Sequence, residues 1–178
     1  MRSDERGRSG LMLLCPHRYC ADGVTEIDPA ELRAAGIDAV LLDLDNTLVG
    51  WQRHDIPGEV VEWIAGLKRA GIRLCLLSNT RHGRRLVSLS ERLDVPYVRR
   101  AWKPRRRGFV SALAELGAEP ARTAMIGDQM FTDVLGGNRM GLYTVMVRPM
   151  HRREFLGTKV SRAAEWALLR FFRRRKLL

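Results

Sequence analysis

The sequence predicts an α/β fold of three layers, in which a doubly wound parallel β-sheet lies between two layers of helices. Three observations support this prediction. Short apolar runs alternate with amphipathic segments, the first run is apolar at almost every position, and a glycine follows several of the amphipathic segments. Continuous apolar runs are typical of strands buried on both faces, and alternation of strands with helices is typical of parallel sheets.

The pattern assigns each element in turn. The first strand is expected at residues 39–45, and a helix is expected at residues 57–70, where Pro57 can begin it and Gly71 can end it. The buried stripe of this helix is expected to be Val60, Val61, Ile64 and Leu67. The remaining strands are expected at residues 72–77, 97–98, 123–126 and 144–147, with helices at residues 81–93, at 104–116 and before Met140.

The segment that precedes the first strand has a weaker pattern. Residues 11–38 are expected to form a lead-in with one short helix, in which Asp28 is the N-cap and Pro29 opens the first turn. A chain of 178 residues suits one domain. We expect a disordered N-terminus at residues 1–12, an α/β domain at 13–160 and a basic amphipathic helix at 161–178.

The composition is that of a globular and strongly basic protein. The formal net charge is +11, and much of the excess lies in residues 99–107 and 170–176. Such an excess favours an anionic partner, which includes nucleic acid, acidic lipid and phosphorylated substrates. Three cysteines without a paired framework indicate a reducing compartment. Because no apolar run is long enough to span a bilayer, we expect a cytoplasmic protein that can lie on the inner face of a membrane.

Reactive side chains follow four of the predicted strands: Asp43 with Asp45, then Ser78, then Lys103, and finally Asp128 with Asp133. Ligands of open parallel sheets bind at the carboxyl ends of the strands, so these groups are expected to converge. Asp43 and Asp45 are two residues apart and point to the same side of a strand. Two such carboxylates favour a cation between them, and Mg²⁺ prefers carboxylate and phosphate oxygens.

This set of side chains suits phosphoryl transfer. One carboxylate can attack phosphorus and another can protonate the leaving oxygen, while Asp128 can complete a magnesium site. The Ser78 hydroxyl and the Lys103 ammonium can hold the phosphoryl oxygens. Taken singly, each residue has a simpler interpretation as a helix cap, a loop former or a solvated side chain. Their order, each at a predicted strand end, favours the chemical interpretation.

Residues 41–48 resemble the first motif, DxDxT, of the haloacid dehalogenase-like hydrolases, and residues 77–79, 103–104 and 127–133 resemble the other three motifs. The resemblance implies a magnesium-dependent phosphatase in which Asp43 is the nucleophile, forming an aspartyl-phosphate, and Asp45 is the general acid and base. It further implies phosphate binding by Ser78, Asn79 and Lys103, and magnesium binding by Asp43, Asp45 (through its backbone carbonyl) and Asp128. Asp133 would bind the magnesium through a water molecule or support the other ligands.

Residues 45–49, 127–129 and 132–139 also resemble the YqeG-like phosphatases of subclass IIIA. Asn46, where many relatives have glycine, agrees with this subclass. Because the subclass is related to the mitochondrial phosphatidylglycerophosphatase, the implied substrate is phosphatidylglycerophosphate. The sequence leaves open a soluble sugar or nucleotide phosphate as substrate. It also leaves open a non-catalytic protein that binds RNA or the ribosome, although no nucleic-acid-binding motif is present and a binder has no need of the complete catalytic set.

The spacing of the motifs leaves no room for a cap domain. An open site suits a lipid headgroup on an anionic membrane, a macromolecule, or a homo-oligomer in which a neighbouring copy forms the lid. In the tail, Ala164, Ala167, Leu168, Phe171 and Phe172 share one face at helical spacing. A basic helix of this kind can bind a membrane surface or dock on its own domain, and both interpretations stay open.

Four further features have modest interpretations. Cys15, His17 and Cys20 lack the fourth ligand of a zinc site, so a packed lead-in is favoured, and Cys75 is expected in the core. Trp51 and His54 both follow the first motif, and either is a candidate for substrate contact. Gly136, Gly137 and Gly141 are expected to serve turns rather than to bind phosphate.

Overall fold

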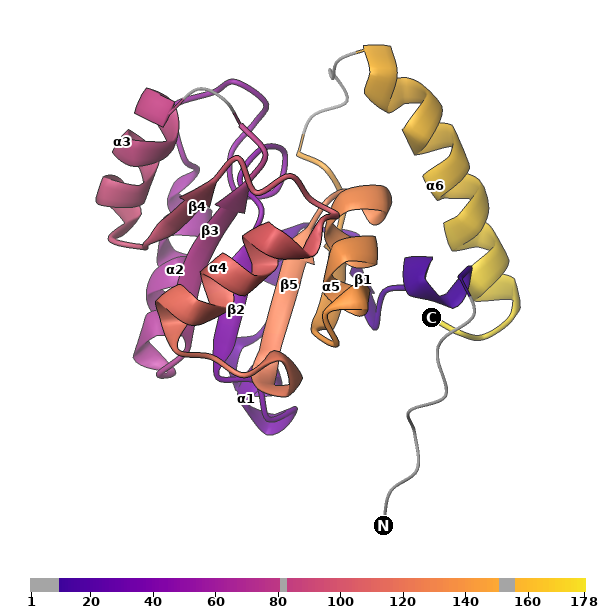
Figure 1. Cartoon of the computed structure of the whole chain (residues 1–178), viewed down its shortest axis with the longest axis horizontal. Coiled ribbons are helices and arrows are strands. Elements are labelled where there is room, and N and C mark those ends of the chain that lie inside the picture. The colour runs from indigo at the N-terminus through magenta and orange to yellow at the C-terminus, as the bar shows by residue number, and fades with distance from the viewer. Residues whose placement is uncertain (1–9, 81–82, 151–155) are drawn as a thin grey trace.

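A six-stranded parallel β-sheet forms the centre of the molecule (Figure 1). The computed structural model describes residues 10–80, 83–150 and 156–178, with side chains of the last segment described from Ala163 onward. Each neighbouring pair of strands is parallel, and the order across the sheet is β1-β6-β5-β2-β3-β4. The strands are β1 (Arg18–Cys20), β2 (Ala39–Leu42), β3 (Arg73–Ser78), β4 (Tyr97–Arg99), β5 (Thr123–Gly127) and β6 (Tyr143–Val147).

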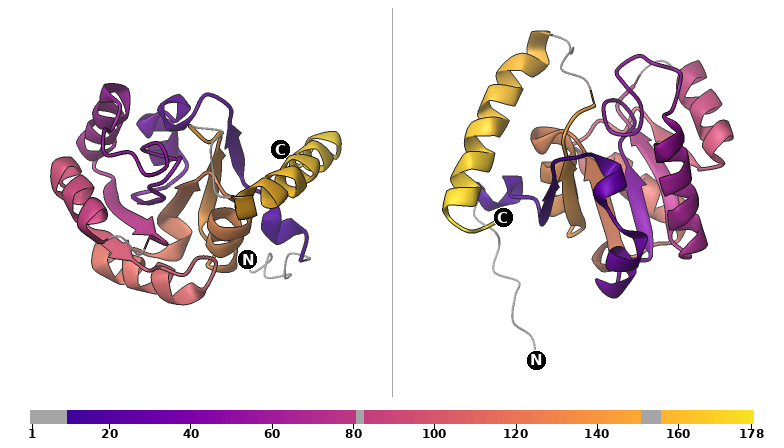
Figure 2. Two further views of the ribbon diagram at one scale, coloured as in Figure 1. Left: turned by 90° about the horizontal axis from the view of Figure 1, so that it is seen from above. Right: turned by 180° about the vertical axis from the view of Figure 1, so that it is seen from behind.

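Helices cover both faces of this sheet, as the views in Figures 1 and 2 show. On one face lie α1 (Pro29–Ala34), α2 (Gly58–Arg69) and α3 (Gly83–Leu93), and on the other lie α4 (Arg106–Leu116) and α5 (Leu135–Arg139). Helix α6 (Leu156–Arg174) stands beside the edge strand β1. The single helical turns are η1 (Met12–Leu14), η2 (Val24–Glu26), η3 (Pro120–Arg122) and the π-helical η4 (Met130–Val134). The predicted three-layer fold is confirmed.

Alternate residues of the central strands supply the two cores. Val40 and Leu42 point into the core beneath α2 and α3, whereas Leu41 points into the core beneath α4. All three side chains are fully buried, because strand β2 has a neighbour on each side and a helical layer on each face. This double burial is the reason for the continuous apolar run in the sequence. The DxDxT motif therefore begins at the end of a strand that is enclosed on all sides.

The lead-in contains a strand that the sequence prediction lacks. Arg18, Tyr19 and Cys20 pair in parallel with Val145, Met146 and Val147 of β6 and extend the sheet by one strand. A three-residue strand has too few positions to show a period, so only its long-range pairing reveals it. The short helix after Asp28 is confirmed, since the Asp28 carboxylate accepts a hydrogen bond from the Ala30 N–H (2.8 Å).

The inner stripe of α2 differs by one residue from the prediction. Val61 is 41% exposed, and Trp63 is buried in its place. The Trp63 indole N–H donates to the Ile27 carbonyl (2.8 Å), so the ring is held between α2 and the lead-in. This polar contact explains why a bulky aromatic residue faces inward at this position.

Gly136 and Gly137 lie within α5, which corrects their expected place in a turn. A methyl group on Gly136 would collide with the Phe109 ring, and one on Gly137 would lie 2.6 Å from Thr144 Cγ2. These glycines therefore allow α5 to lie directly on α4 and on the sheet. Gly141 does serve a turn, with φ at +73°.

Helix α6 docks on its own domain. Phe172 is fully buried beside Cys15, Met130 and Met146, with Leu168 and Leu169 packed against the same cluster. The Glu165 carboxylate is also buried and accepts a hydrogen bond from the Met130 N–H (3.0 Å). The docked face therefore differs from the predicted apolar face, of which Ala164, Ala167 and Phe171 are exposed.

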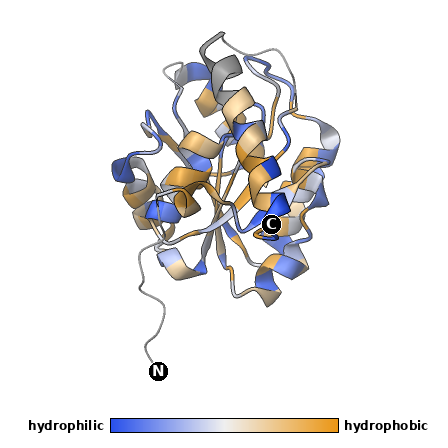
Figure 3. Ribbon diagram, turned by 90° about the vertical axis from the view of Figure 1, so that its right-hand side faces the viewer, coloured by the Kyte–Doolittle hydropathy of each residue, from blue (hydrophilic) through white to orange (hydrophobic). Residues whose placement is uncertain are grey.

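Figure 3 shows hydrophobic residues along the strands and hydrophilic residues towards the C-terminal end of the chain. None of the described helices is long and apolar enough to span a membrane. The expected disorder at residues 1–12 lies largely outside the described residues, which begin at Gly10. Among the described residues there is no separate cap domain, because one loop with α2 joins β2 to β3, and α3 lies between β3 and β4.

Candidate active site

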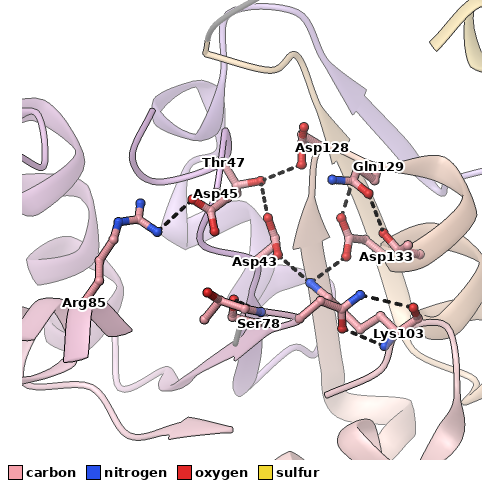
Figure 4. Close-up of polar contacts among 12 residues, drawn as sticks. Asp43, Asp45, Thr47, Ser78, Arg85, Lys103, Asp128, Gln129 and Asp133 are labelled. Atoms are coloured by element: carbon pink, nitrogen blue, oxygen red, sulfur yellow. Dashed lines mark hydrogen bonds and ion pairs between the residues drawn. The ribbon is translucent and has the colours of Figure 1, made fainter. Parts of the chain in front are cut away.

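The site lies at the carboxyl ends of β2 and β5. Leu42 is in register with Ile126, and the Asp43 N–H donates to the Ile126 carbonyl (2.9 Å). Asp43 follows β2 directly and Asp128 follows β5, so their side chains leave the sheet next to one another (Figure 4). Because the carboxyl ends of parallel strands share one edge of the sheet, residues that are far apart in the sequence meet here.

Three carboxylates meet at this point. One oxygen from each of Asp43, Asp128 and Asp133 lies within 4.8 Å of the others, and all three residues are buried. The Thr47 hydroxyl lies between two of them, 3.4 Å from Asp43 Oδ2 and 3.4 Å from Asp128 Oδ1. Carboxylates repel at such distances unless a proton or cation separates them, so the cluster is a candidate cation site.

The Lys103 ammonium group reaches the same cluster. It contacts Asp43 Oδ1 directly and lies 2.8 Å from Asp133 Oδ1, and its side chain is 2% exposed. Burial lowers the pKa of Lys103, but the two carboxylates outweigh burial and raise this pKa above its ordinary value. Lys103 thus supplies a positive charge to the site.

Asp43 has a pKa far from that of an ordinary carboxyl group. Burial raises the pKa of Asp43 to about 7, and the carboxylates of Asp133 and Asp45 add to this effect, whereas Lys103 opposes it. Desolvation thus outweighs the neighbouring ammonium group. A strongly perturbed carboxyl at the carboxyl edge of a parallel sheet is typical of a functional residue.

Asn79 and Ser78 support the loop that carries Lys103. The Lys103 N–H donates to Asn79 Oδ1 (2.8 Å), and Asn79 Nδ2 donates to the Lys103 carbonyl (3.2 Å). The buried Ser78 hydroxyl accepts a hydrogen bond from the Thr80 N–H (3.1 Å). Of the three residues predicted to bind phosphate, Lys103 reaches the carboxylates, and the Asn79 amide holds the Lys103 backbone.

Asp133 is positioned by the π-helical turn η4. Its N–H donates to the Gln129 carbonyl (2.9 Å), and its Oδ2 accepts a hydrogen bond from the Gln129 N–H (3.1 Å). A methyl group on Gly127 would collide with the Asp133 carboxylate, so only glycine lets this side chain lie against the end of β5. Single π-helical turns often occur at functional sites.

Asp45 lies to one side of the buried cluster. Its Oδ1 accepts hydrogen bonds from Arg85 Nη1 (2.8 Å) and from the Gln52 N–H (3.4 Å), and its side chain is 25% exposed. Asn46 has φ at +63°, a conformation that glycine and asparagine adopt most readily, which accounts for the Asn at this motif position. The turn directs Asp45 towards α3, away from Asp133 (Figure 4).

Three residues that contact or support the site were not predicted individually from the sequence. Arg85 comes from an arginine-rich helix without a distinguishing pattern, and Glu165 lies in a tail that has no motif. Thr47 belongs to the DxDxT motif, which was the signal that pointed to it. The backbone N–H of Trp51 donates to Asn46 Oδ1 (3.2 Å), and the His54 carbonyl accepts from Arg92 Nη1 (2.8 Å), so both residues shape the exposed loop beside the site.

The cysteines take no part in a metal centre among the described residues. Cys15, Cys20 and Cys75 are buried thiols, and burial raises the pKa of Cys20 to about 11. His17 Nδ1 lies 2.9 Å from the Thr144 hydroxyl and 3.0 Å from the Thr144 nitrogen. The described part of the chain has one group of three or more candidate metal ligands, the aspartate cluster.

Residues 26–141 match the family of haloacid dehalogenase-like hydrolases. The chain is 34% identical to the Bacillus subtilis protein named "Probable phosphatase YqeG" over 152 residues, which cover 85% of this chain and 88% of that protein. With the DxDxT motif at the end of β2 and the acidic cluster beside it, the chain belongs to the haloacid dehalogenase-like hydrolase family. Within this family it is a phosphatase, that is, a phosphoric monoester hydrolase.

Two further comparisons concern substrate and fold. The chain is 31% identical over 146 residues, 78% of its length, to the chloroplastic phosphatidylglycerophosphate phosphatase 1 of Chlamydomonas reinhardtii, and it spans 54% of that protein. The cobalt-bound structure of the deoxy-D-mannose-octulosonate 8-phosphate phosphatase of Haemophilus influenzae superposes with a TM-score of 0.53 at 20% identity, covering 64% of this chain and 69% of that one. The second likeness supports the fold.

Proposed function

We propose that the protein is a magnesium-dependent phosphatase that hydrolyses phosphatidylglycerophosphate at a membrane surface through an aspartyl-phosphate on Asp43. The observation that carries this proposal is the meeting of Asp43 with two further carboxylates and Lys103 at one buried point. When a carboxylate attacks a phosphate, the negative charge of both groups has to be balanced. Lys103 supplies one positive charge, and the two further carboxylates can hold the cation that supplies the rest.

The reaction has two steps on the residues of this chain. The Asp43 carboxylate attacks phosphorus, and the bond to the leaving alkoxide breaks as Asp45 donates a proton to that oxygen. Asp45 then accepts a proton from a water molecule that attacks the aspartyl-phosphate, which releases inorganic phosphate and restores Asp43. Lys103 and the Ser78 region hold the phosphoryl oxygens during both steps.

The residues fit a divalent cation. Three buried carboxylates carry more negative charge than the single Lys103 neutralises, and all their ligand atoms are hard oxygens. Asp43, Asp128, Asp133 and the backbone carbonyl of Asp45 would hold Mg²⁺. When bound, Mg²⁺ neutralises charge on the carboxylates and on the phosphoryl oxygens.

A lipid substrate is supported by the absent cap and by the outer face of α6. A groove of about 300 Å³ lies between Tyr19 of β1 and the helix, and it is lined by Trp166, Leu169, Arg170, Arg173 and Arg174. Trp166 is 63% exposed, and an exposed indole beside arginines is typical of a membrane-surface helix. Phe172 is buried in the domain, so the side chains that insert into the membrane surface would be Trp166 and the half-exposed Phe171. We place the protein on the cytoplasmic face of an anionic membrane.

The decisive test compares the full chain with Asp43→Asn. This change removes the nucleophile at almost constant volume, so phosphate release should fall by roughly a thousandfold or more while the thermal unfolding transition persists. The assay uses phosphatidylglycerophosphate in mixed micelles with Mg²⁺, and glycerol 3-phosphate as the soluble comparison. Turnover of Asp43→Asn at the wild-type rate would exclude the covalent mechanism. Faster wild-type hydrolysis of glycerol 3-phosphate than of the lipid would favour a soluble substrate.

A further inference from the structure

Arg85 is a largely buried cation whose hydrogen bonds to the described residues are incomplete. Its side chain is 10% exposed, and its Nε donates to the Arg53 carbonyl (2.6 Å) while Nη1 donates to Asp45 (2.8 Å). The other terminal nitrogen, Nη2, is buried and has no hydrogen-bond partner among the residues that the structure describes. Buried donors are nearly always paired, and an orphaned donor on a charged group indicates an acceptor that the free protein does not supply.

The geometry shows that the orphaned nitrogen does not serve Asp45. A guanidinium group can bind one carboxylate with two parallel hydrogen bonds, one from each nitrogen of a pair. Here Asp45 Oδ1 accepts a hydrogen bond from Arg85 Nη1, and Arg85 Nη2 donates to neither oxygen of Asp45. Asp45 therefore uses one terminal nitrogen of the guanidinium group and leaves the other available.

The position of Arg85 defines where that acceptor lies. Asp45 lies between Arg85 and the buried cluster in Figure 4, and in the proposed reaction Asp45 protonates the leaving oxygen. The group that carries this oxygen therefore extends past Asp45, on the side of α3. An acceptor on the leaving group, a short chain away from the scissile phosphate, is the part of a substrate that lies nearest to Arg85.

We propose that Arg85 is a specificity-determining residue, which holds Asp45 with one nitrogen and binds a second anionic group of the substrate with the other. The substrate class is a phosphomonoester whose leaving group carries a further anionic oxygen, such as a phosphodiester or a carboxylate. This inference rests on the proposed function, and it narrows the substrate class. A guanidinium favours an anion over a hydroxyl because hydrogen bonds between two charged groups are stronger than neutral ones.

The test uses three substrates in the presence of Mg²⁺. Glycerol 3-phosphate has a neutral leaving group. Deacylated phosphatidylglycerophosphate adds a phosphodiester in soluble form, and intact phosphatidylglycerophosphate in mixed micelles adds the same group in a lipid. Comparing the second substrate with the third separates a soluble source of the anion from a lipid source.

The informative variant is Arg85→Lys, because a lysine can contact Asp45 but lacks the second forked nitrogen. We expect kcat/KM to fall at least tenfold more for the phosphodiester substrates than for glycerol 3-phosphate, mainly through KM. Arg84→Lys, at an exposed position one residue earlier on α3, is the matched control and should leave the ratio unchanged. An equal loss on all three substrates would overturn the proposal and leave Arg85 as a support for Asp45.

A binding measurement gives a second readout that does not depend on turnover. In an Asp43→Asn background, calorimetric titration with deacylated phosphatidylglycerophosphate should show affinity at least tenfold weaker when Arg85→Lys is added. Equal affinity of the two proteins would also overturn the proposal. Failure of the proposed function looks different, because Asp43→Asn itself would then retain turnover whatever residue stands at position 85.

Discussion

The carboxylate cluster of the site and the arginines of α6 are both concentrations of charge, but they differ in sign and in exposure. Asp43, Asp128 and Asp133 are 7%, 0% and 1% exposed, whereas Arg170, Arg173 and Arg174 are exposed on the outer face of the helix. Buried charges interact strongly and must be neutralised, while exposed charges are screened by water and salt. Substitutions should therefore have large, interdependent effects in the cluster and small, additive effects on α6.

The largest effect is expected when the cluster loses Lys103, the cation that contacts it among the described residues. Lys103→Met keeps the length of the side chain but leaves the buried carboxylates without a counter-charge. We expect turnover to fall by roughly 100-fold or more, and the metal-free protein to lose about 3–5 kcal/mol of unfolding free energy, as measured by urea denaturation. Arg69→Met is the control, because Arg69 pairs with Glu62 where both side chains are exposed, and its loss should cost about 1 kcal/mol or less. Similar losses for both variants would contradict the comparison.

The residues of the cluster could be predicted from the sequence, and those around it could not. Asp43 and Asp128 follow apolar strands, and the carboxyl ends of parallel strands must share one edge of the sheet. The pairing of Asp45 with Arg85 depends on the turn at Asn46 and on the rotation of α3, which no local pattern encodes. The roles of these residues in catalysis stay predictions.

The same contrast holds for the elements of the fold. Strand β2 is visible in the sequence because burial on both faces requires an apolar side chain at each position. Strand β1 has three residues and pairs with β6. This long-range pairing, and no local pattern, determines that the segment is a strand. The docked face of α6 was misplaced because Glu165, a charged residue, is buried by its hydrogen bond to the Met130 N–H.

A second prediction uses pH to test how strongly burial affects the carboxylate cluster. Burial raises the pKa of Asp43 to about 7 from an ordinary 3.8, so between these values the folded chain binds more protons than the unfolded chain. The contribution of Asp43 to stability is thus fully present below about pH 4 and is lost as the pH rises through its folded pKa of about 7. With a chelator present, the unfolding free energy of the wild type minus that of Asp43→Asn should decrease from pH 5 to pH 8.

Magnesium should reverse this trend, because a cation replaces the proton between the carboxylates. Added Mg²⁺ should stabilise the wild type more at pH 8 than at pH 5, as measured by thermal unfolding. A difference between wild type and Asp43→Asn that is constant with pH would show that the buried carboxyl group titrates normally.

The smallest effects are expected on the outer face of α6. Each of Arg170→Gln, Arg173→Gln and Arg174→Gln should weaken binding to anionic vesicles by about 1 kcal/mol, and raised salt should weaken the wild type in the same way. Co-sedimentation with vesicles that contain phosphatidylglycerol measures both effects. Arg122→Gln, an exposed change remote from α6, is the control. Truncation before α6 is a poor test, because it also removes the buried Phe172. If salt does not weaken the binding of the wild type to vesicles, the arginines of α6 do not contribute to membrane binding.

The two ends of the sheet have a consequence for solubility. Open strand edges offer unpaired backbone groups to other chains and so promote aggregation. Here each edge strand, β1 and β4, has only three residues, and the Arg173 guanidinium stacks over the Tyr19 ring of β1 at 4.9 Å. Arg18 and Arg99 add charge to the two edges. A sheet with such short, charged margins resists the edge-to-edge association by which longer apolar strands nucleate fibres.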